Sequence, residues 1–419
     1  MSSQQNLVVA GSLLAAVITL STLVPAPAQD QDQRPATQQD SRPGAGAAPV
    51  STGAGGLDWR TLERPVLRNH VQLTFAEQFV KAGESYFSPD DSMIIFQAIE
   101  TPEDDGAAEP FYAMFIADVL YDDDRITGIE NVRRISPEGS ANTCGWFHPT
   151  EPGVIIFAST IGEPTESTPP GYQRDTGRYR WMFPPEMTIV RTHVDRADGT
   201  PESLEVLIDR DAYVAECALS PCGRYLVYCS LESNEGDLFV RDIETGRTTR
   251  VVEARGYDGG PFFSPDGKRI TYRSDRRGNS LLQLFVGELA FNDRGEVVGL
   301  KAEHQLTDNE HVNWAPFWHP GGRHLVYATS EMGHTNYEVY IIDADPGNLE
   351  GSTGSIRYGT RKRRITFADR ADVLPAFNSD GSIMMWTAQR GEDGESQVWV
   401  ADFVLDIDAG PIPRGYGGR

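Results

Sequence analysis

Several signatures that identify enzymes from a short stretch of sequence are missing from this chain. The 419 residues hold no His-Glu-x-x-His, no paired-cysteine zinc spacing, no phosphate-binding glycine loop and no Asp-x-Asp-x-Asp-Gly calcium loop. A Gly-x-Ser-x-Gly nucleophile turn is absent as well. These absences exclude classes of enzyme that carry a local motif. They do not exclude an active site assembled from distant segments.

Basic residues are also scarce relative to acidic ones. Lys and Arg total 37 against 61 Asp and Glu, which gives a formal charge of −24. Such a surface repels nucleic-acid phosphates and anionic lipid head groups, so we expect neither nucleic-acid binding nor membrane insertion of the mature domain. Two interpretations remain: a charge that serves solubility in a monomer, or an acidic surface that attracts cations or basic ligands.

Cysteine is rare, and only one long apolar run exists. Four cysteines permit up to two disulfides in an exported chain, or they pack as buried free thiols, and the sequence selects no pairing among Cys144, Cys217, Cys222 and Cys229. The apolar run, Leu7 to Val24, precedes Ala26-Pro27-Ala28, so we expect residues 1–28 to be a signal peptide and the protein to be periplasmic or secreted. No Lys or Arg precedes the run, so an uncleaved segment that tethers the protein to the membrane is the alternative.

A sixfold repeat dominates the rest of the chain. Each copy has an aromatic or aliphatic pair, a Ser-Pro-Asp-Gly turn or a variant of it, and an apolar strand. The copies begin at Tyr86, Trp146, Ala218, Phe262, Phe317 and Ala376. Pro fixes φ and Gly relaxes the left-handed position, so the phrase predicts a tight hairpin. An aromatic follows seven or eight residues after the proline position, at Phe96, Phe157, Tyr228, Tyr272, Tyr327 and Trp386.

The repeat predicts an all-β fold: a six-bladed β-propeller over residues 57–409 with four-stranded antiparallel blades. Residues 29–56 should be a disordered linker and 410–419 a flexible tail. The strand at 70–75 precedes the first copy, and only two strands follow the last turn, so we expect strand 70–75 to join the last blade and close the ring. Third strands are expected at 113–117, 187–191, 237–242, 282–288, 338–343 and 397–402.

The segment from Gly259 to Ile270, followed by Tyr272-Arg273-Ser274-Asp275, resembles the propeller repeat of TolB and its relatives. The resemblance covers roughly residues 66–405, and the α/β domain that precedes the propeller in TolB has no counterpart in it. It implies a six-bladed propeller of the cell envelope that binds other proteins. The same repeat resembles the propeller of prolyl oligopeptidases, but the α/β-hydrolase domain of those enzymes is not apparent.

Candidate binding residues lie where the inner strands begin, because the loops entering those strands surround one mouth of the central channel. Each blade has one carboxylate or amide either seven or five residues before its proline position. These residues are Glu84, Asn142, Glu216, Asp258, Asn313 and Asp372. Gathered carboxylates raise one another's pKa values or hold a cation, so a channel-bound calcium or other divalent ion is possible. Capping of strand turns is the alternative role. His311 and His334 with Asp372 are a further metal candidate.

The longest insertion, residues 161–186, opens on the same face and carries Tyr172, Arg178 and Trp181. Aromatics with arginines are typical of binding surfaces. We therefore expect a scaffold that binds an envelope or secreted protein or peptide through the loop-rich face, with no cofactor required. The alternative is a propeller enzyme, a polysaccharide lyase or hydrolase, with an acidic or metal site at the mouth. A screen with uronate oligosaccharides and manganese tests it.

Overall fold

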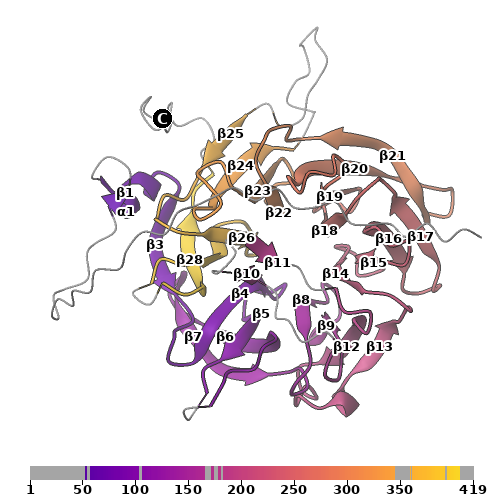
Figure 1. The fold of residues 1–419 in the computed structure, drawn as a ribbon, viewed down its shortest axis with the longest axis horizontal. Coiled ribbons are helices and arrows are strands. Elements are labelled where there is room, and N and C mark those ends of the chain that lie inside the picture. Colours follow the sequence, from indigo (N-terminus) through magenta and orange to yellow (C-terminus); the bar gives the residue numbers. More distant parts are fainter. Residues whose placement is uncertain are drawn as a thin grey trace, which may run out of the picture. The chain divides into compact units, whose positions relative to one another are not determined.

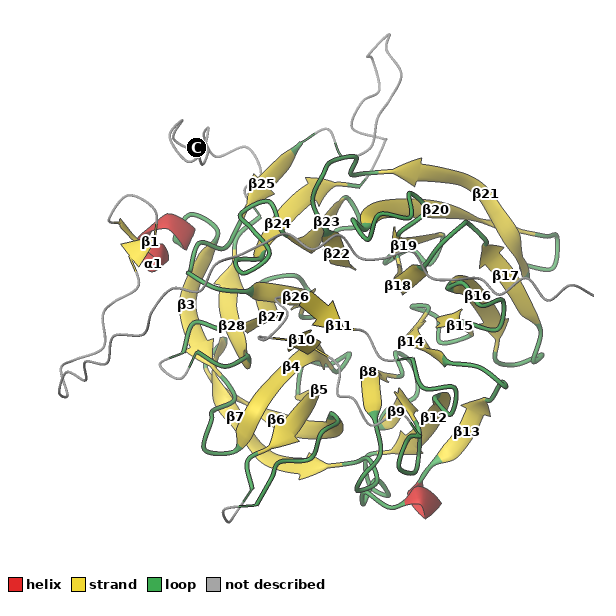
Figure 2. Cartoon of the chain, viewed as in Figure 1, coloured by secondary structure: helices red, strands yellow, loops and turns green. Residues whose placement is uncertain are grey.

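The fold is described from a computed structural model. It describes residues 52–53, 57–102, 106–165, 171–173, 178–180, 183–344, 359, 361–391 and 394–405, and for 52–53, 57, 171–173 and 178–180 only the backbone. All of them belong to one compact unit, Ala48–Arg419. Strands dominate this unit, and the only helices in its described part are α1 (Trp59–Glu63) and a short 3₁₀ turn, Pro201–Ser203 (Figure 2).

Six four-stranded antiparallel sheets surround a central axis, which confirms the predicted six-bladed β-propeller (Figure 1). The first three blades are β4 (Phe79–Phe87), β5 (Met93–Glu100), β6 (Ala113–Asp122) and β7 (Arg125–Arg134); β8 (Asn142–Phe147), β9 (Val154–Ser159), β12 (Thr188–His193) and β13 (Glu205–Ile208); and β14 (Val214–Leu219), β15 (Tyr225–Ser230), β16 (Asp237–Asp242) and β17 (Thr248–Val252).

The other three blades complete the ring. They are β18 (Asp258–Phe263), β19 (Arg269–Ser274), β20 (Gln283–Phe291) and β21 (Val297–Gln305); β22 (Asn313–Trp318), β23 (His324–Thr329), β24 (Glu338–Asp343) and β25 (Lys362–Arg364); and β26 (Asp372–Phe377), β27 (Ile383–Ala388) and β28 (Gln397–Phe403) with β3 (Leu67–Gln72). Two small hairpins stand apart from the blades: β1 (Thr52–Gly53) with β2 (Leu57–Asp58), and β10 (Gly171–Gln173) with β11 (Arg178–Arg180).

Strand β3 closes the ring by pairing with β28, as predicted, but it spans residues 67–72 rather than 70–75. The strand ends early because a side chain replaces the backbone as hydrogen-bond partner. The Thr74 hydroxyl accepts from the backbone N–H of Val398 at 2.8 Å and donates to Gln397 at 2.7 Å. Hydroxyls at the same place in other blades, Ser136, Thr307 and Thr366, accept from the third strand in the same way.

The aromatic residues predicted to anchor each second strand form the centre of the inter-blade core. All six are at most 1 % exposed, and full burial of such a side chain stabilises the fold by about 2–3 kcal/mol. The turn that precedes each of these strands is held by its own side chains. In the fourth blade the Ser264 hydroxyl accepts from the Arg269 N–H, and the Asp266 carboxylate accepts from the Lys268 N–H at 3.0 Å. The repeated phrase therefore builds the scaffold.

Candidate binding cavity at the channel mouth

Every inner strand has a bulge at the same position, five residues before the proline position of the repeat. The six residues there have φ between 45° and 58°, and the strand register shifts at each of them. Only glycine adopts this conformation without strain, yet five of the six are other residues. The six are Glu84, Cys144, Glu216, Gly260, Ala315 and Leu374. The bulges present these positions to a common cavity at the mouth of the channel.

Two residues further along each strand, aromatic side chains fill the channel. Rings of blades one, two, four and five meet with centroids 5.1 to 6.2 Å apart. Blades one and four lie on opposite sides of the ring, and their rings are 5.7 Å apart, so the channel is closed at this depth. We call these four side chains the aromatic plug: Tyr86, Trp146, Phe262 and Phe317. Alanines occupy the equivalent positions in blades three and six.

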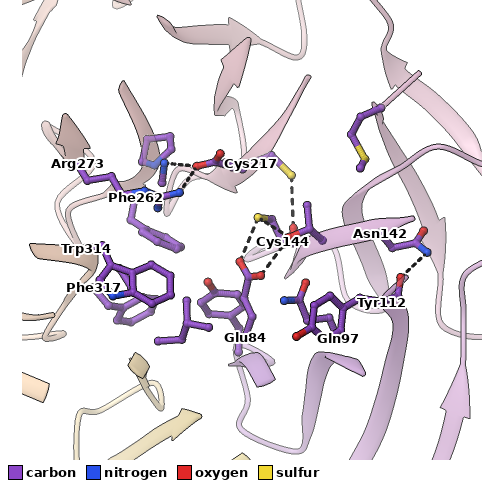
Figure 3. A pocket seen from close by; sticks show the side chains of 18 of the residues that line it. Glu84, Gln97, Tyr112, Asn142, Cys144, Cys217, Phe262, Arg273, Trp314 and Phe317 are labelled. Atoms are coloured by element: carbon purple, nitrogen blue, oxygen red, sulfur yellow. Dashed lines mark hydrogen bonds and ion pairs between the residues drawn. The ribbon is translucent and has the colours of Figure 1, made fainter. Parts of the chain in front are cut away.

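Above the plug lies a cavity of about 130 Å³, which we call the mouth cavity (Figure 3). Its lining includes the six bulge residues and, from loops of the first three blades, Phe111, Phe183 and Tyr213. Phe183, from the long insertion, packs on Tyr213 with ring centroids 5.0 Å apart. One side of the cavity is therefore polar and the other apolar, where blades five and six contribute Ala315 and Leu374.

Glu216 is fully engaged in this cavity. Its carboxylate accepts from Arg273 at 2.8 Å, from the Gly260 N–H at 2.5 Å, and from the Tyr257 and Tyr213 hydroxyls. Arg273 and Glu216 are both nearly buried. Gly260 makes the pairing possible, because a Cβ there would lie 2.0 Å from Nη1 of Arg273.

Glu84 has only neutral donors. The Cys144 thiol and the Thr143 hydroxyl each donate to one carboxylate oxygen at 3.1 Å, and no cation contacts Glu84 in the described part of the chain. Burial raises the pKa of Glu84, and the neighbouring Glu216 carboxylate adds to this effect. Burial also raises the pKa of the Cys144 thiol well above its usual value. The thiol therefore stays protonated near neutral pH and is not a ready nucleophile.

The structure brings together three of the residues chosen from the sequence, Glu84, Asn142 and Glu216. The other three from the inner strands lie buried outside the cavity. Asn313 donates to the Gln283 side chain and to loop carbonyls, and Asp258 accepts from the Ala254 N–H. Asp372 accepts from Arg390 and from the Trp386 indole. Asn142 also caps a loop, donating to the Tyr112 carbonyl at 3.0 Å. Asn142, Asn313 and Asp258 cap loops, whereas Asp372 belongs to a buried ion pair with Arg390. Ligand binding by all four stays a prediction.

The remaining candidates are in the insertion. Tyr172 and Arg178 lie on β10 and β11, where only the backbone is described, and Trp181 lies outside the described residues. Sequence reasoning missed Gln97, Arg273 and the aromatic plug. The plug was visible as the first residue of the repeated phrase. Gln97 and Arg273 are on second strands, where nothing in the pattern distinguishes a side chain at the mouth.

Metal and disulfide expectations concern the same region. Among the residues that the structure describes, no three His, Cys, Asp or Glu side chains come close enough to hold a metal ion. Binding of calcium at the mouth therefore stays a prediction. The four cysteines are all free in this structure. No helix in the described ranges is long and apolar enough to cross a membrane.

Comparison with known proteins agrees with this architecture. Residues 191–358 match the model of the TolB beta propeller domain. An uncharacterized protein of Agrobacterium fabrum is 29% identical over 137 residues, 31% of this chain and 43% of that protein. Dipeptidyl-peptidase 5 of Porphyromonas gingivalis is 33% identical over 262 residues, 55% of this chain and 36% of the peptidase.

The chain thus spans less than half the length of these curated relatives. Among solved structures, the putative TolB from Agrobacterium tumefaciens aligns with a TM-score of 0.47 and 15% identity, over 77% of this chain and 91% of that one. The match over residues 191–358 and the six blades lead to one conclusion: the chain is a six-bladed β-propeller whose repeats are similar to those of TolB.

Proposed function

We propose that this protein is an exported binding scaffold that holds a protein or peptide of the cell envelope at the mouth cavity. The observation that carries the proposal is the cavity itself, which is closed below by the aromatic plug, is mainly apolar with a few polar groups, and is lined in part by loops of three blades. A small cavity with a few convergent polar groups is a typical anchor site for one side chain of a partner. The peptide-directed name of the dipeptidyl-peptidase relative is in keeping with such a ligand.

The strain at the mouth supports binding as the role of this site. Five non-glycine residues in left-handed conformations each cost of order 1–2 kcal/mol, and such strain concentrates where function requires a particular side-chain placement. A purely structural inner strand would have no need of Glu84 in that conformation, because blade four achieves the same bulge with glycine.

Affinity capture from envelope extract tests the proposal with a matched pair of variants. Ala315→Leu fills the cavity with the side chain that blade six already carries at this position, Leu374, and so should abolish capture. Leu374→Ala widens the same cavity and should retain capture. Deletion of residues 165–182 tests the insertion separately and should weaken binding without unfolding the propeller. If both point variants captured the partner equally well, the mouth cavity would not be the binding site.

A further inference from the structure

The charges that line the mouth cavity do not balance. The side chains along it that can carry a charge are Glu84, Glu216 and Arg273. Arg273 is committed to Glu216 at 2.8 Å, and that pair is neutral overall. An ionised Glu84 therefore leaves the cavity with one negative charge. Glu84 is half-buried, and a charge that is largely removed from water without a charged partner is costly. The cavity therefore favours a ligand with one positive charge.

A second acceptor points to the same kind of ligand. Gln97 lines the cavity, is 9 % exposed, and its Oε1 has no hydrogen-bond partner in the described part of the chain. It lies directly opposite Gly83 in the β4–β5 pairing, and so beside Glu84 (Figure 3). The Gln97 Oε1 atom and the Glu84 carboxylate can both accept hydrogen bonds from a ligand. This favours a ligand group that donates several hydrogen bonds.

The floor of the cavity also suits a cation. Three plug residues, Tyr86, Phe262 and Phe317, line it with their rings. Aromatic faces attract ammonium groups by about 0.5–2 kcal/mol and repel anions. The cavity is small, about 130 Å³, which admits a compact ammonium on an alkyl stem rather than a bulky ligand.

We infer that the mouth cavity binds a primary ammonium group, from a lysine side chain or a free N-terminus of a peptide, between Glu84 and Gln97 and above the aromatic plug. The ammonium supplies three donors, for the Glu84 carboxylate and the Gln97 carbonyl oxygen. The alkyl stem contacts the apolar side at Ala315 and Leu374. This inference rests on the proposed function and specifies the part of the partner that enters.

The test uses the full chain and small probes. Nα-acetyl-lysine amide presents the side-chain ammonium, alanine amide presents an α-amine, and Nα-acetyl-norleucine amide is a neutral analogue of the first that lacks the ammonium and is one heavy atom shorter. We expect saturable binding of at least one amine in NMR or calorimetric titration, and at least tenfold weaker binding of the norleucine probe. No saturation by either amine at about 50 mM, or equal binding of norleucine, overturns the inference.

Variants connect the probe to the cavity. Glu84→Gln keeps the shape and removes the charge, and should weaken amine binding at least tenfold. Gln97→Met removes the second acceptor and provides the same test if Glu84→Gln fails to fold. Glu151→Gln, in an exposed turn after β8, is the charge-matched control and should bind like the parent.

Four further outcomes separate the inference from the proposed function. Amine binding unchanged by both cavity variants overturns the inference. So does calcium binding that depends on Glu84 in a protein that binds no amine. Envelope capture that survives Glu84→Gln but fails with Ala315→Leu would reject the ammonium and retain the proposed function. If the parent protein itself captured no specific partner, the proposed function would be rejected.

Discussion

At the scale of single residues, the bulge position shows how one place in a repeat is used differently in each blade. Blade four has Gly260, which gives space to Arg273, whereas blade five has Ala315 at φ 51°. The left-handed backbone is common to both, but only Gly260 has a neighbour that excludes a side chain. The same backbone therefore tolerates alanine in one blade and not in the next.

Gly260→Ala should destabilise the protein by about 3 kcal/mol, because the methyl group strains the backbone and displaces Arg273 from Glu216. Ala315→Gly is the matched control. It relieves left-handed strain but increases the entropy of the unfolded chain, so its effect should stay within about 1 kcal/mol of zero. Denaturant unfolding of both variants measures the difference, and equal effects would contradict this account.

Asp258 should make stability depend on pH, because burial raises its pKa to about 6 from 3.8. Between these values the folded state holds the proton and the unfolded state has released it. The free energy of unfolding therefore falls as pH rises from about 4 to 6, by on the order of 2–3 kcal/mol. Thermal melts of the parent and Asp258→Asn over this range should show the variant gaining relative stability. A constant difference would show that Asp258 does not titrate there.

At the scale of elements, helix α1 acts as a clasp on the closing blade. Glu63, at its end, accepts two hydrogen bonds from Arg390 at 3.0 Å and one from the Phe367 N–H at 2.7 Å. His70 on β3 contacts the same carboxylate at 2.8 Å. Arg390 also binds Asp372 and packs against the rings of Trp59, Trp386 and Trp399. The closing strand is thus fastened by a buried ionic network.

Arg390→Met should destabilise the fold by about 3–5 kcal/mol, because it leaves the Glu63 and Asp372 carboxylates buried without their cation. Arg191→Met breaks an exposed pair with Glu205, at 2.9 Å, and should cost at most about 1 kcal/mol. The two unfolding free energies are compared by urea titration. Similar costs for both would mean that the clasp adds little to ring closure.

The fold was predictable because a turn, a buried aromatic and a third strand recur six times in the same order along the chain. All three features indicate the same four-stranded blade. The clasp was not, since α1 has five residues and Glu63 carries no pattern that signals its partners. The site was half predictable. Spacing from the turn located Glu84 and Glu216. It did not show which inner-strand side chains point into the channel and which have partners elsewhere, as Asp258 and Asp372 do.

At the scale of the whole molecule, the charge of −24 should guide a basic partner to the propeller before any contact is made. Raising the salt from about 50 to about 500 mM should slow association of a lysine-containing peptide at least several-fold, since screening acts on exposed charges. Dissociation should change little if the ammonium binds at Glu84 as inferred, because that contact would lie inside the mouth cavity. Surface plasmon resonance separates the two rates. A salt effect mainly on dissociation would instead place the contact on the exposed surface.

The aromatic plug has a consequence for traffic through the ring. Because rings from opposite blades are in contact, with centroids 5.7 Å apart, the plug obstructs passage from one face of the ring to the other. The channel is therefore closed at the plug, and a ligand in the mouth cavity would enter and leave through the same opening. A partner can therefore offer only a chain end or one side chain, and cannot thread a continuous polymer through the axis.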